Sequence, residues 1–219
     1  MSSKKNRPTH AMSRRQKIGI IILCFVSVSF FSLLDRGLFK HKWQRQPESD
    51  EQARAYDLEK YHKKIFTVVK VVDGDTIDID IPDFNHSHTR IRFWGIDTPE
   101  TKSDEIDVMY FGPEATDFTT KLALEKQVKV YLDEGNRTRG KYSRLLAYVQ
   151  LPDGRFLNEV LLIEGLAYAD LRFRHSFYHR YQQLQASARR QKKGLWQNVI
   201  RQQLPEWLQK ERPNLLLEK

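Results

Sequence analysis

The amino-acid sequence predicts an α+β domain built from five short β-strands and three helices. Period-two alternation and β-branched residues indicate strands at residues 66–72, 76–81, 89–94, 128–132 and 144–150. Helix start and stop signals indicate helices at residues 113–125, 157–164 and 177–192. Five strands with helices placed late in the chain are compatible with a small barrel capped by helices, but the pattern alone does not determine the topology.

The first two strands are expected to form a hairpin. Four valines lie within residues 68–72, and the Asp73-Gly74-Asp75 sequence that follows is a turn signal. Isoleucines then alternate with aspartates over residues 77–81, as in a strand. The third strand repeats the alternation, with Ile91 and Phe93 on one side and Arg92 on the other, before a Thr-Pro pair interrupts it.

The predicted helices have recognisable ends. Pro113 fits the first turn of a helix, where its missing N–H group is not needed for hydrogen bonding. Gly165 and Gly194 fit the positions at which the next two helices stop. The helices therefore follow the third and fifth strands, which places them outside the early hairpin.

Carboxylates gather where two of the strands end, and one strand also carries an arginine. The acidic residues are Asp73, Asp75, Asp97 and Glu100. Oxygen ligands without histidine or cysteine suit a hard cation such as calcium or magnesium. The Asp73-Gly74-Asp75 turn and the strand end from Asp97 to Glu100 are each also ordinary on their own. Their combination in this order, about 20 residues apart, indicates a metal site beside a phosphodiester.

The positive charge of the whole chain does not by itself indicate a polyanion-binding protein. The net charge is +9, but residues 1–45 hold ten basic residues and one acid, so the rest of the chain is neutral. Within the predicted domain, residues 65–134 carry a net charge of −8 and residues 135–193 carry +8. The first half suits a cation and the second half suits phosphates.

The N-terminal part resembles a membrane anchor. A basic tail over residues 1–17 precedes an uncharged apolar run over residues 18–34, which as a helix would span about 25 Å, at the short end for crossing a bilayer. The alternatives are a cleaved signal peptide and a buried helix of a soluble domain. Six basic residues before the run against four after it favour a cytoplasmic N-terminus and an extracytoplasmic domain.

Two segments flank the predicted domain. Residues 35–63 are polar and charged and are interpreted as a linker or a short helix that separates the domain from the membrane. Residues 198–219 form a C-terminal extension in which Trp207, Leu208 and three further leucines indicate packing back onto the domain. The domain itself is expected to span residues 64–197.

Five collinear motifs carry a family resemblance. The motifs VDGDT, IDTPET, YFGPEA, RTRGKYSRLLAY and NEVLLIEGLA resemble the staphylococcal nuclease (thermonuclease) family, in the order in which that family has them. The resemblance covers roughly residues 64–197. It implies an OB-fold barrel, a form whose open face commonly receives single-stranded nucleic acid. It also implies a calcium-dependent endonuclease and exonuclease of DNA and RNA that leaves 3′-phosphates.

The same resemblance implies a role for each matched residue. Asp75 and Asp97 match direct carboxylate ligands of Ca²⁺, and Thr98 matches a ligand through its backbone carbonyl. Asp73 and Glu100 match partners reached through water, and Glu100 also matches the residue that orients or deprotonates the attacking water.

Further matches concern the substrate. Arg92 and Arg144 match the two arginines that grip the phosphate, and Lys141 and Tyr142 match residues that touch a terminal phosphate. Paired tyrosines of the family fall on Leu171 and Phe173, of which only Phe173 keeps a stacking surface.

One further difference from the family's motifs and two histidines lie in the second half of the domain. Ser143 replaces a glycine of the family just before the second arginine. His175 and His179 lie four residues apart, which is a metal-binding spacing on a helix, but without a nearby pair of acids they are interpreted as surface histidines.

Two other classes of function remain open from the sequence. A non-catalytic OB-type module would bind nucleic acid without needing the acids, and a membrane-tethered calcium-binding adaptor would need the acids but not both arginines. The joint presence of acids and arginines favours the nuclease.

Overall fold

A computed structural model describes residues 49–101 and 108–217, which belong to one compact unit. The predicted anchor at residues 18–34 lies outside the described residues. Within the described residues, none of the helices combines the length and the apolar character that a bilayer crossing requires.

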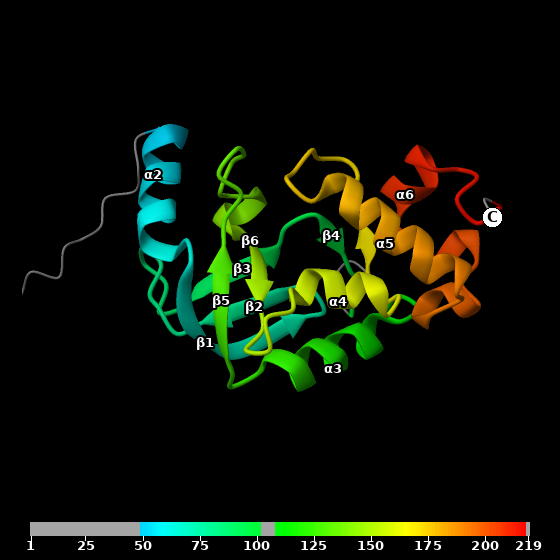
Figure 1. Cartoon of the computed structure of the whole chain (residues 1–219), viewed down its shortest axis with the longest axis horizontal. Coiled ribbons are helices and arrows are strands. Elements are labelled where there is room, and N and C mark those ends of the chain that lie inside the picture. The colour runs from blue at the N-terminus through cyan, green and yellow to red at the C-terminus, as the bar shows by residue number, and fades with distance from the viewer. Residues whose placement is uncertain (1–48, 102–107, 218–219) are drawn as a thin grey trace, which may run out of the picture. The chain divides into compact units, whose positions relative to one another are not determined.

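Five strands form a closed barrel, which confirms the predicted barrel architecture (Figure 1). Its strands follow one another around the barrel in the order β1-β2-β3-β6-β5. All neighbours are antiparallel except β3 and β6, which are parallel. The strands are β1 (Lys64–Asp73), β2 (Thr76–Ile79), β3 (Thr89–Phe93), β5 (Gln127–Tyr131) and β6 (Leu145–Gln150).

The predicted hairpin is present, and its turn is held from two sides. Asp73 pairs with Thr76 across the turn between β1 and β2. A Cβ atom at Gly74 would lie 2.8 Å from side-chain atoms of Ala115 and Thr98, so only glycine lets these segments approach. The turn is therefore fixed next to the segment that carries the second group of acids, Asp97 and Glu100.

Two short strands beside the barrel position this second group. Strand β4 (Ile96–Asp97) pairs with β7 (Tyr168–Ala169), so that Asp97 lies opposite Tyr168. The peptide N–H of Asp170 also donates to the carbonyl of Gly95 at 2.9 Å. Neither strand was predicted, because two residues are too few to show an alternation.

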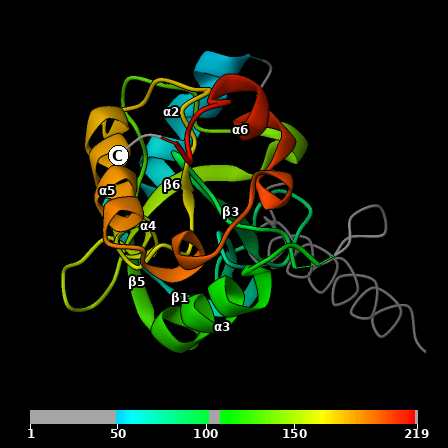
Figure 2. The ribbon, with the colours of Figure 1, turned by 90° about the vertical axis from the view of Figure 1, so that its right-hand side faces the viewer.

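Helices surround the barrel strands. The three predicted helices are α3 (Gly112–Ala123), α4 (Leu157–Ile163) and α5 (Tyr178–Arg190), each within two residues of its predicted start and within two residues of its predicted end. The short helix η2 (Gly194–Gln197) follows α5, and the C-terminal extension adds η3 (Arg201–Gln203) and α6 (Glu206–Glu211). A further short helix, η1 (Lys141–Ser143), precedes β6. Figure 2 views the molecule from the side of α5 and α6, with α3 on the opposite edge of the barrel from α6.

The segment expected to be a linker or a short helix contains α2 (Asp50–Tyr61), and this helix is fixed to the barrel. Arg139 pairs with Asp57 of α2 and with Asp83 of the loop after β2. The Asp57 side chain also accepts a hydrogen bond from the hydroxyl of Thr138 at 2.6 Å. Helix α2 thereby holds the loop that leads to Arg144.

Two apolar clusters stabilise the unit. The larger one fills the barrel and includes Ile77, Ile79, Ile91 and Phe93, which confirms the inward side of the predicted alternation. The smaller one joins Tyr168 and Trp196 to leucines of the C-terminal extension. Leu208 and Leu215 are buried there, whereas Leu217 is exposed, so the expected packing of the extension is confirmed in part.

Candidate functional site

A cleft of about 1670 Å³ brings together most of the residues singled out in the sequence. It lies where the hairpin turn, the end of β3, β4, the loop around η1 and the C-terminal extension meet. Its lining includes Asp73, Asp75, Arg92, Asp97, Thr98, Glu100, Lys141, Arg144 and Phe173. The acids of the first half of the chain thus face basic residues of the second half.

Arg92 lies between two of the predicted metal ligands. Its guanidinium group forms ion pairs with the carboxylates of both Asp75 and Asp97. The second oxygen of Asp75 accepts a hydrogen bond from the backbone N–H of Thr98 at 2.8 Å. Both carboxylates are therefore oriented toward one cationic group at the centre of the cleft.

The other two acids, Asp73 and Glu100, are partly buried near like charges, and their pKa values are raised. Burial raises the pKa of Glu100 above its usual range, and the negative charges of Asp73 and Asp97 raise it further. Burial also raises the pKa of Asp73, against the opposing effect of Arg92. A cation entering the cleft would meet carboxylates that are poorly solvated and close to like charges.

The predicted cation site is not preassembled in the part of the chain that the structure describes. Among residues 49–101 and 108–217, no group of three acidic, histidine or cysteine side chains is arranged to hold a metal ion. Arg92 supplies the compensating positive charge instead. The donor set nevertheless fits a hard divalent ion, because it consists of carboxylate oxygens that already converge on a cation.

Arg144 and its neighbours form the basic side of the cleft. Burial lowers the pKa of Arg144, and the adjacent charge of Arg92 lowers it further. Among the described residues no carboxylate lies within ion-pair distance of Arg144, whose Nε is 3.4 Å from the carbonyl of Lys141. Two guanidinium groups are thus held near each other, as the binding of a shared anion requires.

Tyr142 does not line the cleft. Its side chain is 77% exposed, and its ring packs beside the ammonium of Lys141 and the guanidinium of Arg144. Its backbone and that of Ser143 are left-handed, with φ values of 62° and 57°. Ser143 thus adopts a conformation that favours glycine.

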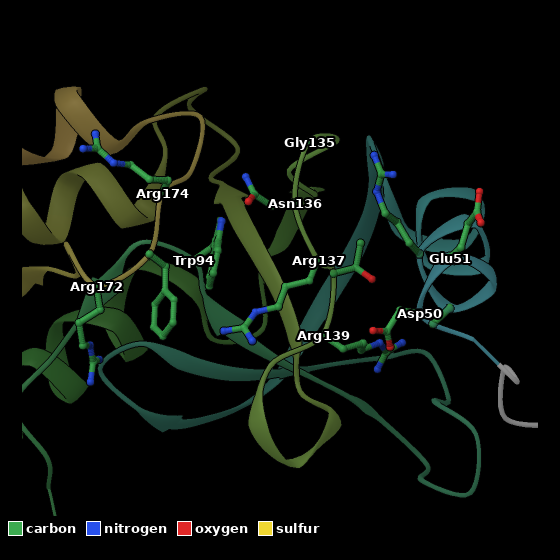
Figure 3. Close-up of a pocket in the computed structure, with 13 residues that line it drawn as sticks. Asp50, Glu51, Trp94, Gly135, Asn136, Arg137, Arg139, Arg172 and Arg174 are labelled. Atoms are coloured by element: carbon green, nitrogen blue, oxygen red, sulfur yellow. The ribbon is translucent and has the colours of Figure 1, made fainter.

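A pair of aromatic residues adjoins the cleft and lines a second pocket of about 850 Å³. The ring of Phe173 stacks on that of Trp94, with centroids 5.9 Å apart and an interplanar angle of 24°. The guanidinium of Arg137 lies 5.0 Å from the centroid of Phe173 and 5.9 Å from that of Trp94. Figure 3 shows Arg137 reaching across this pocket, with Arg172 and Arg174 on one side and Asp50 and Glu51 of α2 on the other.

Two of these residues were not predicted to belong to the site. Trp94 was assigned only to a strand, and Arg137 only to a motif. The feature that could have identified them is the combination of an aromatic residue at a strand end with a basic loop, because such surfaces stack unpaired bases.

His175 is buried, so its interpretation as a surface histidine is wrong. Only 7% of the residue is exposed, and its ring packs against Tyr148, Tyr181 and Trp94. A Cβ atom at Gly95, where φ is +79°, would lie 2.4 Å from this ring. Burial lowers the pKa of His175 to about 4.

This burial predicts a loss of stability in mild acid. The unfolded chain takes up the His175 proton near pH 6.5, whereas the folded protein does so only near pH 4. The contribution is therefore complete above pH 6.5 and is lost as the pH falls to 4. The free energy of unfolding should fall by about 3 kcal/mol over this window because of His175 alone.

Urea unfolding of the wild type and of His175→Gln at a series of pH values measures this contribution. The variant should lose stability less steeply than the wild type between pH 7 and pH 4. His179→Gln, on the exposed surface of α5, is the matched control and should follow the wild type. Equal slopes for the wild type and His175→Gln would show that the folded protein binds the proton as readily as the unfolded chain.

Comparisons with known proteins agree with this geometry. Residues 90–198 match the family described as Staphylococcal nuclease homologue. A thermonuclease of Staphylococcus hyicus is 37% identical over 142 residues, which cover 64% of this chain and 80% of that protein. Endonuclease YncB of Bacillus subtilis is 37% identical over 119 residues, covering 53% of this chain and 54% of that protein. An uncharacterized endonuclease of Escherichia coli O157:H7 is 32% identical over 151 residues, covering 66% of this chain and 84% of that protein.

Proposed function

Because the chain belongs to the staphylococcal nuclease family, we propose that it is a calcium-dependent nuclease that hydrolyses phosphodiester bonds of DNA and RNA. One observation carries this proposal. A single cleft contains the four predicted acids and both predicted arginines, in positions that suit a cation and a phosphate at the same time. A module that only binds nucleic acid has no use for buried acids beside the phosphate, because they repel it.

The residues that would hold the ion are those that surround Arg92. Asp75, Asp97 and the backbone carbonyl of Thr98 would bind Ca²⁺ directly, and Asp73 and Glu100 would bind it through water. When bound, the ion supplies Lewis-acid activation of the phosphate and a template for in-line attack. The ion pairs of Arg92 with Asp75 and Asp97 support this assignment, since they show that both carboxylates are directed at one positive charge.

The arginines stabilise the charge that develops during hydrolysis. Guanidinium groups bind two phosphate oxygens at once, and charge on these oxygens increases in the transition state. Glu100 accepts the proton of the attacking water, since its carboxylate lines the cleft together with the residues that would hold the ion. The new bond forms between the water oxygen and phosphorus while the bond to the 5′-oxygen breaks. The 5′-oxygen takes up a proton from solvent and leaves as a 5′-hydroxyl, and the other product ends in a 3′-phosphate.

The substrate is a single strand in preference to a duplex. The ring of Phe173 is 40% exposed and is backed by the buried ring of Trp94, with Arg137 beside it, so it offers a surface on which an unpaired base can stack. Paired bases within a duplex have both faces covered and cannot use this ring. Lys141 and Tyr142 would contact a neighbouring phosphate from the exposed side of the loop.

The apolar run at residues 18–34 supports a further part of the proposal. We propose that it anchors the catalytic domain on the extracytoplasmic side of a membrane, with secretion after signal cleavage as the alternative. The support is the excess of basic residues before the run.

A labelled oligonucleotide assay tests the proposal. Equal concentrations of single-stranded and duplex DNA are incubated with the protein and calcium, and cleavage, binding and product ends are measured separately. The expected result is faster cleavage of the single strand, with products that carry 3′-phosphates and accept a 3′-tail only after phosphatase treatment. Tight binding without cleavage would identify a binding module, and calcium binding without any affinity for nucleic acid would identify an adaptor.

A further inference from the structure

The C-terminal extension contributes a wall of the cleft, although it lies beyond the part of the chain that matches the family. The match ends at residue 198, and the lining of the cleft includes Arg201, Trp207 and Lys210. The extension is anchored there by its apolar side chains. Leu204, Leu208 and Leu215 are buried in the smaller cluster against Tyr168 and Trp196.

Trp207 of helix α6 contacts a predicted metal ligand directly. Its indole N–H donates a hydrogen bond to Oδ2 of Asp97 at 2.7 Å, across 110 residues of sequence. The other carboxylate oxygen, Oδ1, is the one that faces Arg92. The two oxygens of Asp97 are therefore distinguished, with one held by the extension and one directed into the centre of the cleft.

A third residue holds the indole in place. The guanidinium of Arg172 lies 4.3 Å from the centroid of the Trp207 ring, which is a cation–π contact. Arg172 is itself fixed by two hydrogen bonds to Asp170, each of 2.8 Å, and its Nη2 is 3.9 Å from Oδ2 of Asp97. The orientation of the indole is thus set by a buried acid on the strand-end loop after β7.

We propose that Trp207 is a positioning residue that orients Asp97 for calcium, so that the C-terminal extension completes the metal site. The inference rests on the proposed function. An indole can only donate hydrogen bonds, and a bond to a carboxylate is charge-assisted and strong. With Oδ2 engaged, the carboxylate presents Oδ1 in one orientation to an incoming ion. Partners of this kind typically raise metal affinity 10- to 100-fold.

The test is calcium titration of the full-length protein by calorimetry, without nucleic acid. Trp207→Phe keeps the aromatic ring and removes the N–H donor, and it should weaken calcium binding roughly 10- to 100-fold. At saturating calcium its rate of DNA cleavage should approach that of the wild type, because the ligand set is intact. The calcium concentration for half-maximal cleavage should rise by the same factor as the dissociation constant.

Trp196→Phe is the matched control. Trp196 lies in the same apolar cluster, packs edge-on against Tyr168, and has an indole N–H without an acceptor among the described residues. It should therefore bind calcium like the wild type, and urea unfolding of the metal-free proteins checks that both variants fold.

The outcomes separate the inference from the proposed function. Unchanged calcium affinity in a folded Trp207→Phe protein would overturn the inference and leave the proposed function standing. Absence of both calcium binding and cleavage in the wild type would overturn both.

Discussion

Replacing Arg92 with glutamine should change calcium binding and DNA cleavage in opposite directions. The guanidinium lies between Asp75 and Asp97, so an ion must share these carboxylates with an existing positive charge. Without that charge, the calcium dissociation constant should fall roughly tenfold or more. Cleavage at saturating calcium should nevertheless fall by roughly 10³-fold or more, because an arginine on a transferring phosphoryl group contributes that much.

The same substitution has a third expected effect. The metal-free variant leaves two largely buried carboxylates without their partner, which should lower the free energy of unfolding by about 3–5 kcal/mol. Calcium should restore most of this loss, since it replaces the missing positive charge. Calorimetry, cleavage rates and urea unfolding with and without calcium measure the three effects.

Arg90→Gln provides the matched control for Arg92→Gln. Arg90 lies two residues away on β3 and pairs with Asp78 at 2.8 Å, but it does not line the cleft. It is half-exposed, so its loss should change stability by no more than about 1 kcal/mol and leave calcium binding and cleavage unaltered. If Arg92→Gln bound calcium no more tightly than Arg90→Gln did, the two carboxylates would not be ligands of the ion.

Replacing Arg144 with alanine should lower cleavage by roughly 10³-fold without lowering stability. Among the described residues Arg144 has no carboxylate within ion-pair distance, and burial together with the nearby charge of Arg92 already lowers its pKa. Its removal therefore breaks no ion pair within the described part of the chain and relieves a repulsion. Single-turnover cleavage at saturating calcium measures the loss of rate, and urea unfolding measures the stability.

Two further variants sharpen the Arg144 result. Arg144→Lys keeps the charge but not the paired donors, so it should recover only part of the lost rate. Arg155→Ala removes an exposed arginine that pairs with Asp153 outside the cleft, and it should cleave like the wild type. A fall in affinity for DNA with an unchanged maximal rate would assign Arg144 to binding of the substrate alone.

The barrel was predictable because its strands carry their own signals. Alternating isoleucines in β2 and the Asp73–Asp75 turn are local features, and the structure contains both the hairpin and the inward side chains. The OB-fold form of the barrel came from the resemblance to a known family, and the strand order was not predicted. The parallel pairing of β3 with β6 joins Ile91 to Leu145, and no local pattern reports a contact across that many residues.

The site was predictable as a set of residues but not as an arrangement. Motifs identified the acids and both arginines, and the alternation in β3 indicated that Arg92 faces the acids, yet neither shows that its guanidinium group lies between Asp75 and Asp97. The contact of Trp207 with Asp97 spans 110 residues and joins a segment outside the family match to one inside it. Such contacts depend on how the extension packs against the domain through Leu204, Leu208 and Leu215. A sequence pattern does not show that packing.

Removal and restoration of calcium is the most direct test of the account. The protein is incubated with single-stranded DNA in calcium, then with excess of the chelator EGTA, and finally with calcium added back beyond the chelator. We predict rapid cleavage, then none, then full recovery. Cleavage that continues undiminished in the chelator would contradict the claim that acids and arginines in this cleft act together through a bound ion.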